Sequence, residues 1–379
     1  MTLVSTENLS IDTSLQERQR LLSLDFMRGF IMVLLMLEGS RLFDHLLEWQ
    51  SEGLFHNFML QFTHHPWHGL RFWDLIQPGF MFIAGTALAF SIDAQQRKRI
   101  KWKSSFYKVV KRSGWLFFWG VLDYAVRPSG LSFELWDVLT QLSFTTIVTF
   151  LVIQWPVMYQ LALSAAILLL TEFLYRFTNI PGFDQPFTDQ HNFGNYVDLL
   201  LMNKINTGGW VAINCIPTTV HTLWGAMAGR VLLSTESDHT KIKKILAGGV
   251  IALCIGILLD YTTTPVIKRI ATSSFVCVSG GYCLIGLAFL YWWIDILKHR
   301  RFISFFLIVG MNSLFIYLFF EIVGSRWFNG YIEAIVEGLI GHISGITSVF
   351  LGIIASIVIF LLEWKMCQFL YRKHIFFKI

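Results

Sequence analysis

Charged side chains are scarce in this sequence. They make up 15% of its 379 residues, against roughly 25% in soluble domains. Hydrophobic residues reach 54%, so a soluble protein of this size would lack the polar residues that cover a surface. The apolar residues also fall in blocks of about twenty, the length that crosses the core of a bilayer. These properties exclude a soluble globular domain and predict an integral membrane protein.

Cysteines are few, and a cleavable leader is not visible. The five cysteines are an odd set with no CxxC spacing, which argues against a disulfide framework or a zinc ribbon. The first apolar block continues from Asp25 without a small-residue cleavage site, so we expect it to remain as a transmembrane helix. The net charge of +5 comes from short basic loops that set membrane topology. We therefore expect a lipid bilayer around the chain and no nucleic-acid partner.

The pattern of apolar blocks predicts an all-α, polytopic membrane bundle of about ten transmembrane helices. We expect a polar segment over residues 1–23, followed by a single membrane domain over 24–379. The stretch 325–345 is either a loop or an interfacial helix, and no tandem or inverted repeat is visible. The expected spans are 24–47, 74–94, 106–126, 134–154, 156–176, 210–233, 245–262, 273–295, 302–324 and 346–370.

Basic residues gather in alternate loops of this layout, which predicts its orientation. Loops on the cytoplasmic side carry an excess of Lys and Arg. The richer side would therefore be cytoplasmic, both termini would lie there, and the long loops 48–73 and 177–209 would lie outside. The basic residues of that side are Arg18, Arg20, Arg97, Lys98, Arg99, Lys101, Lys103, Lys241, Lys243, Lys244, Lys298, Arg300, Arg301, Arg372, Lys373 and Lys378.

Asp25, Arg28 and Glu38 are ionisable residues within the first expected span. Such groups are costly in a membrane and are functional candidates. Asp25 and Arg28 are three residues apart, share a helix face and can pair. That pair either fixes the helix end at the interface or lets Arg28 help to hold an anionic donor from the cytosol. Glu38 lies deeper and needs either a structural partner or a polar cavity.

The segment from Thr63 to Asp74 is the richest in polar and aromatic residues, and it precedes the second expected span. Its histidines could bind a metal, form an interfacial belt, relay protons or act as a general base. We favour a general base, because histidine titrates near working pH. No cysteine or carboxylate cluster completes a metal site, so no metal is expected. Asp74 would either orient an imidazole or cap the helix. The histidines concerned are His56, His64, His65 and His68.

Polar residues recur on later spans. His221 and Asn312 lie in otherwise apolar segments and could line a polar tunnel or make hydrogen bonds between helices. Interhelical hydrogen bonding is the better interpretation for Thr222 and Ser313. Glu321 lies beyond Asn312 in the same expected span, and it too could line a polar tunnel or make hydrogen bonds between helices.

Four stretches together carry a resemblance. They are Leu22-Ser23-Leu24-Asp25 through Arg28-Gly29; His64-x-x-Trp67-x-Gly69 with Asp74-Leu75-Ile76-x-Pro78; Thr264-Pro265 leading to Ser273-Ser274-Phe275-Val276 and Trp293-Ile294-Asp295; and Gly310-Met311-Asn312-Ser313 with Tyr317. In this order, over residues 21–320, they resemble the heparan-α-glucosaminide N-acetyltransferase family and its bacterial relatives in the transmembrane acyltransferase group.

The resemblance implies a multi-pass acetyltransferase of a bacterial inner membrane. It implies acetyl-CoA as the donor, an amino sugar as the acceptor on the far side, and a homodimer. The catalytic histidine of the family corresponds to His64. The family's asparagine near the end of the first span is replaced by Leu37-Glu38-Gly39-Ser40, so Glu38 would take a polar role there. The arginine usual after the V-L-Q run is absent from 138–142.

We therefore expect transfer of an acetyl group from cytosolic acetyl-CoA to a sugar or amino sugar outside. His64 would be the base, oriented by Asp74, and Asn312 would stabilise the oxyanion. The donor would be held by Arg28, Asp25 and His221, and Trp67 would contact the acceptor. Direct transfer and an acyl-histidine intermediate both remain open. The alternatives are an amino-sugar transporter and a structural or regulatory membrane protein.

Overall fold

The computed structural model describes residues 21–127 and 130–377, and most of the expected polar segment 1–23 lies outside this part. The first half contains α2 (Leu22–Gly39), α3 (Leu42–Trp49), α4 (Gly53–Met59), η1 (Leu60–Phe62), η2 (Phe72–Leu75), α5 (Ile76–Arg97), α6 (Trp102–Ala125), β1 (Val126–Arg127), β2 (Gly130–Leu131), α7 (Val138–Val152) and α8 (Val157–Phe177). The second half contains α9 (Phe193–Met202), η3 (Ala212–Asn214), α10 (Cys215–Leu233), α11 (Asp238–Thr262), α12 (Ser273–Leu290), η4 (Tyr291–Ile296), α13 (Ile303–Gly310), α14 (Ser313–Leu318), η5 (Phe319–Phe328), α15 (Asn329–Ile340) and α16 (Ser348–Arg372).

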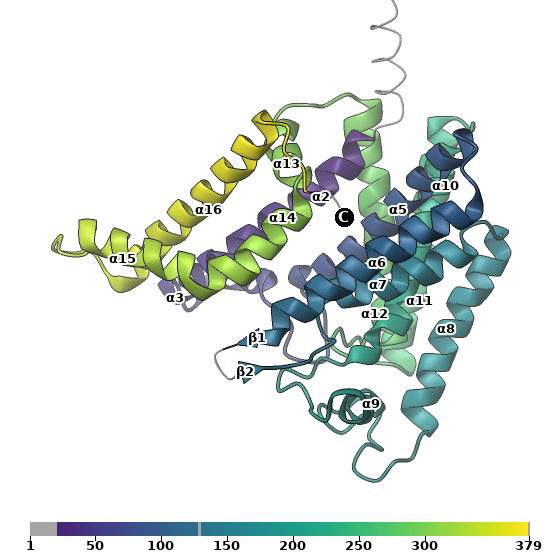
Figure 1. The fold of residues 1–379 in the computed structure, drawn as a ribbon. Helices are drawn as coiled ribbons and strands as arrows, with labels where there is room; N and C mark the ends of the chain where they lie inside the picture. The colour runs from purple at the N-terminus through teal and green to yellow at the C-terminus, as the bar shows by residue number, and fades with distance from the viewer. Residues whose placement is uncertain (1–20, 128–129, 378–379) are drawn as a thin grey trace, which may run out of the picture.

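The helices form two groups (Figure 1). One contains α5 to α8 and α10 to α12, and the other contains α2, α3 and α13 to α16. Close packing within each group depends on glycine. A Cβ atom on Gly85 of α5 would lie 1.8 Å from the carbonyl oxygen of Thr222 on α10. A Cβ atom on Gly29 of α2 would lie 2.1 Å from the carbonyl oxygen of Phe306 on α13. Glycine therefore permits the close approach of helix backbones at these contacts.

Five helices of the described residues are long and apolar enough to cross a membrane, and a bent pair raises this to six. They are Phe72–Arg97, Val157–Phe177, Asp238–Thr262, Ser273–Ile296 and Ser348–Arg372, with Ile303–Gly310 and Ser313–Ile340 as the bent pair. The expected number was about ten. Helix α2 does not meet this test of length, hydropathy and charge because it carries Asp25, Arg28 and Glu38. Helix α7 does not meet it because it has only 15 residues.

Several expected boundaries differ from the structure. The span 24–47 is two helices, because Arg41 adopts a positive φ of 63° between them and this conformation cannot continue a right-handed helix. The span 302–324 breaks between Gly310 and Ser313 with a bend of 72°. The stretch 325–345, left open as a loop or helix, is helical through Ile340. The fold is all-α apart from the two-residue strands β1 and β2, which pair antiparallel.

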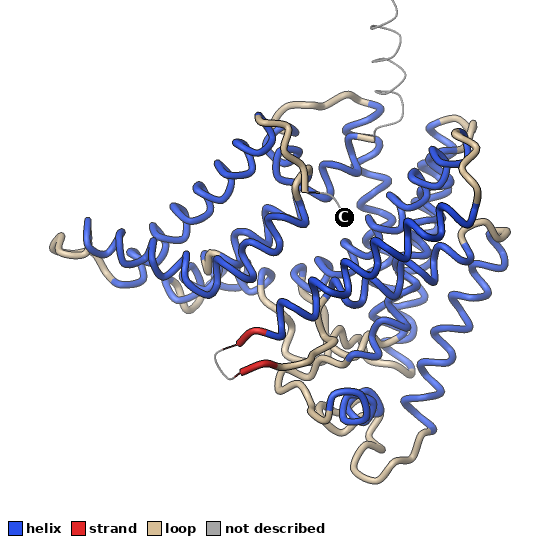
Figure 2. The backbone as a smooth tube through the Cα atoms, in the orientation of Figure 1, coloured by secondary structure: helices blue, strands red, loops and turns tan. Residues whose placement is uncertain are grey.

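The connections of the bundle collect at two opposite ends. The α5–α6 and α10–α11 connections and the end of α16 lie at the upper end in Figure 1, where several of the basic groups fall. Long loops, α9 and the β1–β2 hairpin lie at the lower end, as the tan segments of Figure 2 show. The helices therefore alternate in direction as the charge pattern predicts. The cytoplasmic placement of the upper end and of the termini stays a prediction.

Candidate active site

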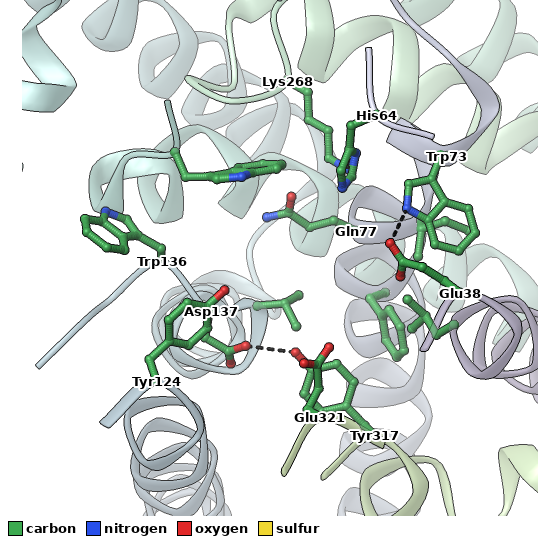
Figure 3. A pocket seen from close by; sticks show the side chains of 15 residues that line it. Glu38, His64, Trp73, Gln77, Tyr124, Trp136, Asp137, Lys268, Tyr317 and Glu321 are labelled. Carbon is green, nitrogen blue, oxygen red and sulfur yellow. Dashed lines mark hydrogen bonds between the residues drawn. The ribbon is translucent and has the colours of Figure 1, made fainter. Parts of the chain in front are cut away.

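A cavity of about 240 Å³ lies between the two helix groups, where α2 and α6 end and α5 and α7 begin. Helix α2 and the α14–η5 segment supply one wall. The other is supplied by η2, α5, α6, α7 and the four loops that carry His64, Trp136, Trp210 and Lys268. Figure 3 shows that polar groups point into this space from several elements. The polar and aromatic side chains that line it are His64, Lys268, Glu38, Gln77, Asp137, Glu321, Trp73, Trp136, Trp210, Phe80, Tyr124 and Tyr317.

His64 enters this cavity from the loop before α5, and Asp74 fixes it there. The Nδ1 of His64 lies 3.0 Å from the Oδ1 of Asp74. The other oxygen of Asp74 accepts hydrogen bonds from the backbone N–H groups of Arg71, at 2.9 Å, and His65, at 3.2 Å. The Arg71 side chain donates in turn to the carbonyl of His64 and the hydroxyl of Thr63. The carboxylate of Asp74, which is 1% exposed, thus holds both ends of the loop.

Lys268 approaches the same imidazole from the loop between α11 and α12. Its Nζ lies 3.1 Å from His64 Nδ1 and 3.6 Å from Asp74 Oδ1. The ammonium lies 5.2 Å from the centre of the Trp210 ring. The side chain is 6% exposed, and burial lowers the pKa of Lys268 to about 8. No signal in the sequence points to this residue, because a single lysine in a short loop between two apolar segments is indistinguishable from a charge that sets topology.

The environment of His64 favours a neutral imidazole. Burial lowers the pKa of His64, and the positive charge of Lys268 lowers it further, against the opposing effect of Asp74. The ring contacts Trp210 edge-on at 5.4 Å between centroids. Its side chain is 36% exposed, and among the described residues its Nε2 has no hydrogen-bond partner. A neutral imidazole with one nitrogen held and the other open toward a cavity is suited to take up a proton.

Carboxylates gather on the remaining walls of the cavity. Glu38 accepts a hydrogen bond of 3.2 Å from the indole N–H of Trp73, so this acidic residue has both a partner and a polar cavity. The hydroxyl of Tyr317 donates to Asp137 at 2.8 Å. Glu321 lies beside this pair in Figure 3. The cavity therefore combines a cationic lysine beside His64 with an acidic and aromatic wall.

Asn312 is not brought to the cavity, so the expectation that it stabilises an oxyanion is corrected. Its side-chain amide donates to the carbonyl of Ile375 at 3.0 Å, and its oxygen accepts from the N–H of Phe377 at 3.0 Å. The break between α13 and α14 places Asn312 where it binds the C-terminal segment. Both ends of its amide are occupied by that contact.

His221 and Trp67 also lie outside the cavity lining. His221 is fully buried, with its Nε2 at 2.8 Å from the Ser279 hydroxyl, so it joins α10 to α12 instead of lining a tunnel. The indole N–H of Trp67 donates to the carbonyl of Phe187 at 2.7 Å. That contact joins the loop 177–209 to the loop that carries His64, and Trp67 lies outside the cavity lining.

The remaining expected site residues lie elsewhere. Arg28 and Asp25 form an ion pair of 3.5 Å in the first turns of α2, at the end opposite Glu38. His68 pairs with Asp260 at 2.9 Å. Within residues 21–127 and 130–377, no group of three or more His, Cys, Asp or Glu side chains could hold a metal ion.

Comparison with known families identifies the chain. The sequence model described as heparan-alpha-glucosaminide N-acetyltransferase, catalytic, matches residues 20–258, more than half of the 379. The chain belongs to this family. No curated protein matches it. The expected family is therefore confirmed, and the matched region of this acetyltransferase includes Glu38, His64 and Asp74. Lys268, Tyr317 and Glu321 complete the cavity from beyond the matched residues.

Proposed function

We propose that this member of the heparan-α-glucosaminide N-acetyltransferase family moves an acetyl group from cytosolic acetyl-CoA to an amino sugar on the opposite face of a bacterial inner membrane. The observation that carries the proposal is the 3.0 Å contact of His64 with buried Asp74, inside a cavity at one end of the bundle. A histidine held by a carboxylate is the arrangement of a general base.

In the reaction, Asp74 accepts the hydrogen of His64 Nδ1, which leaves the lone pair of Nε2 facing the acceptor. Nε2 takes a proton from the sugar amine as its nitrogen attacks the thioester carbon. The C–N bond forms, the C–S bond breaks, and the imidazolium returns the proton to the sulfur of CoA. Direct transfer needs no covalent enzyme intermediate, and an acyl-histidine is the two-step alternative.

The donor would enter from the basic end of the bundle. Helix α2 has 18 residues, which span roughly 27 Å at 1.5 Å per residue. Arg28 lies near its first turn and Glu38 near its last. The phosphates of CoA would therefore stay near Arg28 and the basic loops while the thioester reaches the cavity. The lining extends about one helical turn inward, to Leu35 and Phe80, toward the side from which the thioester would arrive.

The acceptor would occupy the acidic part of the cavity. Glu38, Asp137 and Glu321 line it together with three tryptophans and two tyrosines, a wall that suits a sugar bearing a basic amine. An amine acceptor is favoured over a hydroxyl for this reason. We found no observation that favours the transporter alternative. The homodimer stays a prediction.

The test uses detergent-purified protein, labelled acetyl-CoA and a panel of amino sugars and their hydroxyl analogues. We expect acetylated amino sugar from the wild type and none from His64→Ala. Sugar uptake by vesicles without any CoA, together with no acetylated product, would overturn the proposal in favour of transport.

A further inference from the structure

Two side chains of opposite charge contact the same nitrogen of His64. Nδ1 lies 3.0 Å from Asp74 Oδ1 and 3.1 Å from Lys268 Nζ. A carboxylate only accepts hydrogen bonds and an ammonium only donates them. Nδ1 of a neutral imidazole either carries the hydrogen or presents a lone pair. The two hydrogen bonds therefore belong to different tautomers of His64.

The tautomers differ in their ability to act as a base. When Lys268 donates to Nδ1, the ring hydrogen resides on Nε2, and the nitrogen in the cavity cannot take up a proton. When Nδ1–H donates to Asp74, the lone pair of Nε2 faces the cavity. The contact made by Lys268 thus opposes the one that prepares His64 for catalysis.

We propose that Lys268 is a positioning residue that holds His64 in the Nε2–H tautomer until an acyl donor binds. This inference rests on the proposed function. The carbonyl oxygen of the thioester would attract the ammonium of Lys268 away from Nδ1. Nε2 then releases its proton to the solvent in the cavity. Nδ1 takes up a proton, keeps it and forms an Nδ1–H hydrogen bond to Asp74, and the ammonium keeps its three hydrogens. No net proton is gained or lost.

The placement of Lys268 supports such a movement. It lines the same cavity as His64 (Figure 3), and its flexible four-carbon chain ends beside the face of Trp210. Asp74 and Glu38 attract its charge and Arg269 repels it. Once at the thioester oxygen, the ammonium would also stabilise the oxyanion of the tetrahedral intermediate, the role that Asn312 does not fill.

The test reads the tautomer directly. The full chain is labelled with ¹⁵N-histidine and placed in lipid nanodiscs, and the His64 signal is assigned by its loss in His64→Gln. NMR distinguishes the protonated from the unprotonated ring nitrogen. We expect the Nε2–H form in the wild type without a donor and the Nδ1–H form in Lys268→Met. An unreactive acyl-CoA analogue with a ketone in place of the thioester should convert the wild type to Nδ1–H.

Two further variants separate this role from a structural one. Lys268→Arg keeps the charge and should keep the Nε2–H form. If Lys268→Met does not fold, this variant still tests the role of the charge. Lys204→Met removes a lysine that pairs with Glu134 and should leave the tautomer unchanged. In turnover, Lys268→Met should lower kcat by about 10²–10³-fold, the usual cost of losing one oxyanion donor, with little change in the KM for the acceptor.

Nδ1–H in the donor-free wild type, or an unchanged tautomer in Lys268→Met, would overturn the proposal. The NMR measurement reports the tautomer of His64 in protein that is not transferring acetyl groups. An absence of acetyl transfer would therefore refute the proposed function, and these two NMR results would refute the role of Lys268 alone.

Discussion

His64 Nδ1 and Asp74 Oδ1 lie 3.0 Å apart, although ten residues separate them in the sequence. The loop between them closes because Asp74 also accepts the backbone N–H groups of His65 and Arg71. One carboxylate thus fixes both the fold of the loop and the orientation of the imidazole. This relationship leads to several expected outcomes.

His64→Ala should reduce acetyl transfer by about 10²–10⁴-fold, the usual contribution of a general base. The protein should still insert and elute as the wild type on size exclusion, because the His64 side chain is partly exposed. His56→Ala is the matched control, since His56 contacts only the carbonyl of Gln50 among the described residues. Normal turnover by His64→Ala in membranes would end the assignment of the base.

Asp74→Asn should lower kcat by about 10²–10⁴-fold with little change in the KM for acetyl-CoA. An amide can donate to Nδ1, which would force the ring hydrogen onto Nε2 and block the base. Asp260→Asn is the control, because Asp260 makes a similar contact of 2.9 Å with the exposed His68. Equal losses in the two variants would show that the effect is structural.

The pH dependence of kcat/KM for acetyl-CoA, at saturating acceptor, should be bell-shaped. His64 must be neutral, and burial and Lys268 lower its pKa, so the acidic limb should lie below the ordinary histidine value of about 6.5. The pKa of Lys268 is about 8, so activity should fall as pH rises above that value. Lys268→Arg should remove the alkaline limb, and an unchanged alkaline limb in that variant would contradict the role of the ammonium.

Asn312→Ala should leave kcat near the wild-type value and weaken the fold. It loses two hydrogen bonds to the C-terminal segment, together worth about 1–3 kcal/mol. The measurement is thermal unfolding in detergent alongside turnover, with Ser313→Ala as the neighbouring control. A loss of turnover like that of His64→Ala, at unchanged thermal stability, would restore Asn312 to the site.

The part of the site that could be predicted from sequence is local. His64 and Asp74 belong to one short segment that begins a helix, so Asp74 could be offered from sequence either as the group that orients the imidazole or as a helix cap. Glu38 was recognisable because an acidic residue in an apolar helix needs a partner. Lys268 is 204 positions from His64, and no periodicity or spacing connects the two.

The errors have equally physical causes. Residues 302–324 were expected to form one continuous span, but the chain bends by 72° between Gly310 and Ser313, and Asn312 at this bend binds the C-terminal segment. The expected number of about ten spans stays a prediction, because five or six helices pass a test of length and composition, and α2 carries too many charges and α7 is too short to pass it. Of the three charged residues in α2, Glu38 lines the polar cavity, whereas Asp25 and Arg28 pair with each other at the opposite end of the helix.

The central claim is tested most directly in sealed proteoliposomes. Protein with outward-facing loops 48–73 is selected by an epitope tag in that loop. Acetyl-CoA is enclosed inside and an amino sugar is supplied outside. We expect acetylated sugar outside the vesicles from the wild type and none from His64→Ala. Equal product from both proteins, or product only when acetyl-CoA and sugar share one side, would contradict transfer across the membrane through His64.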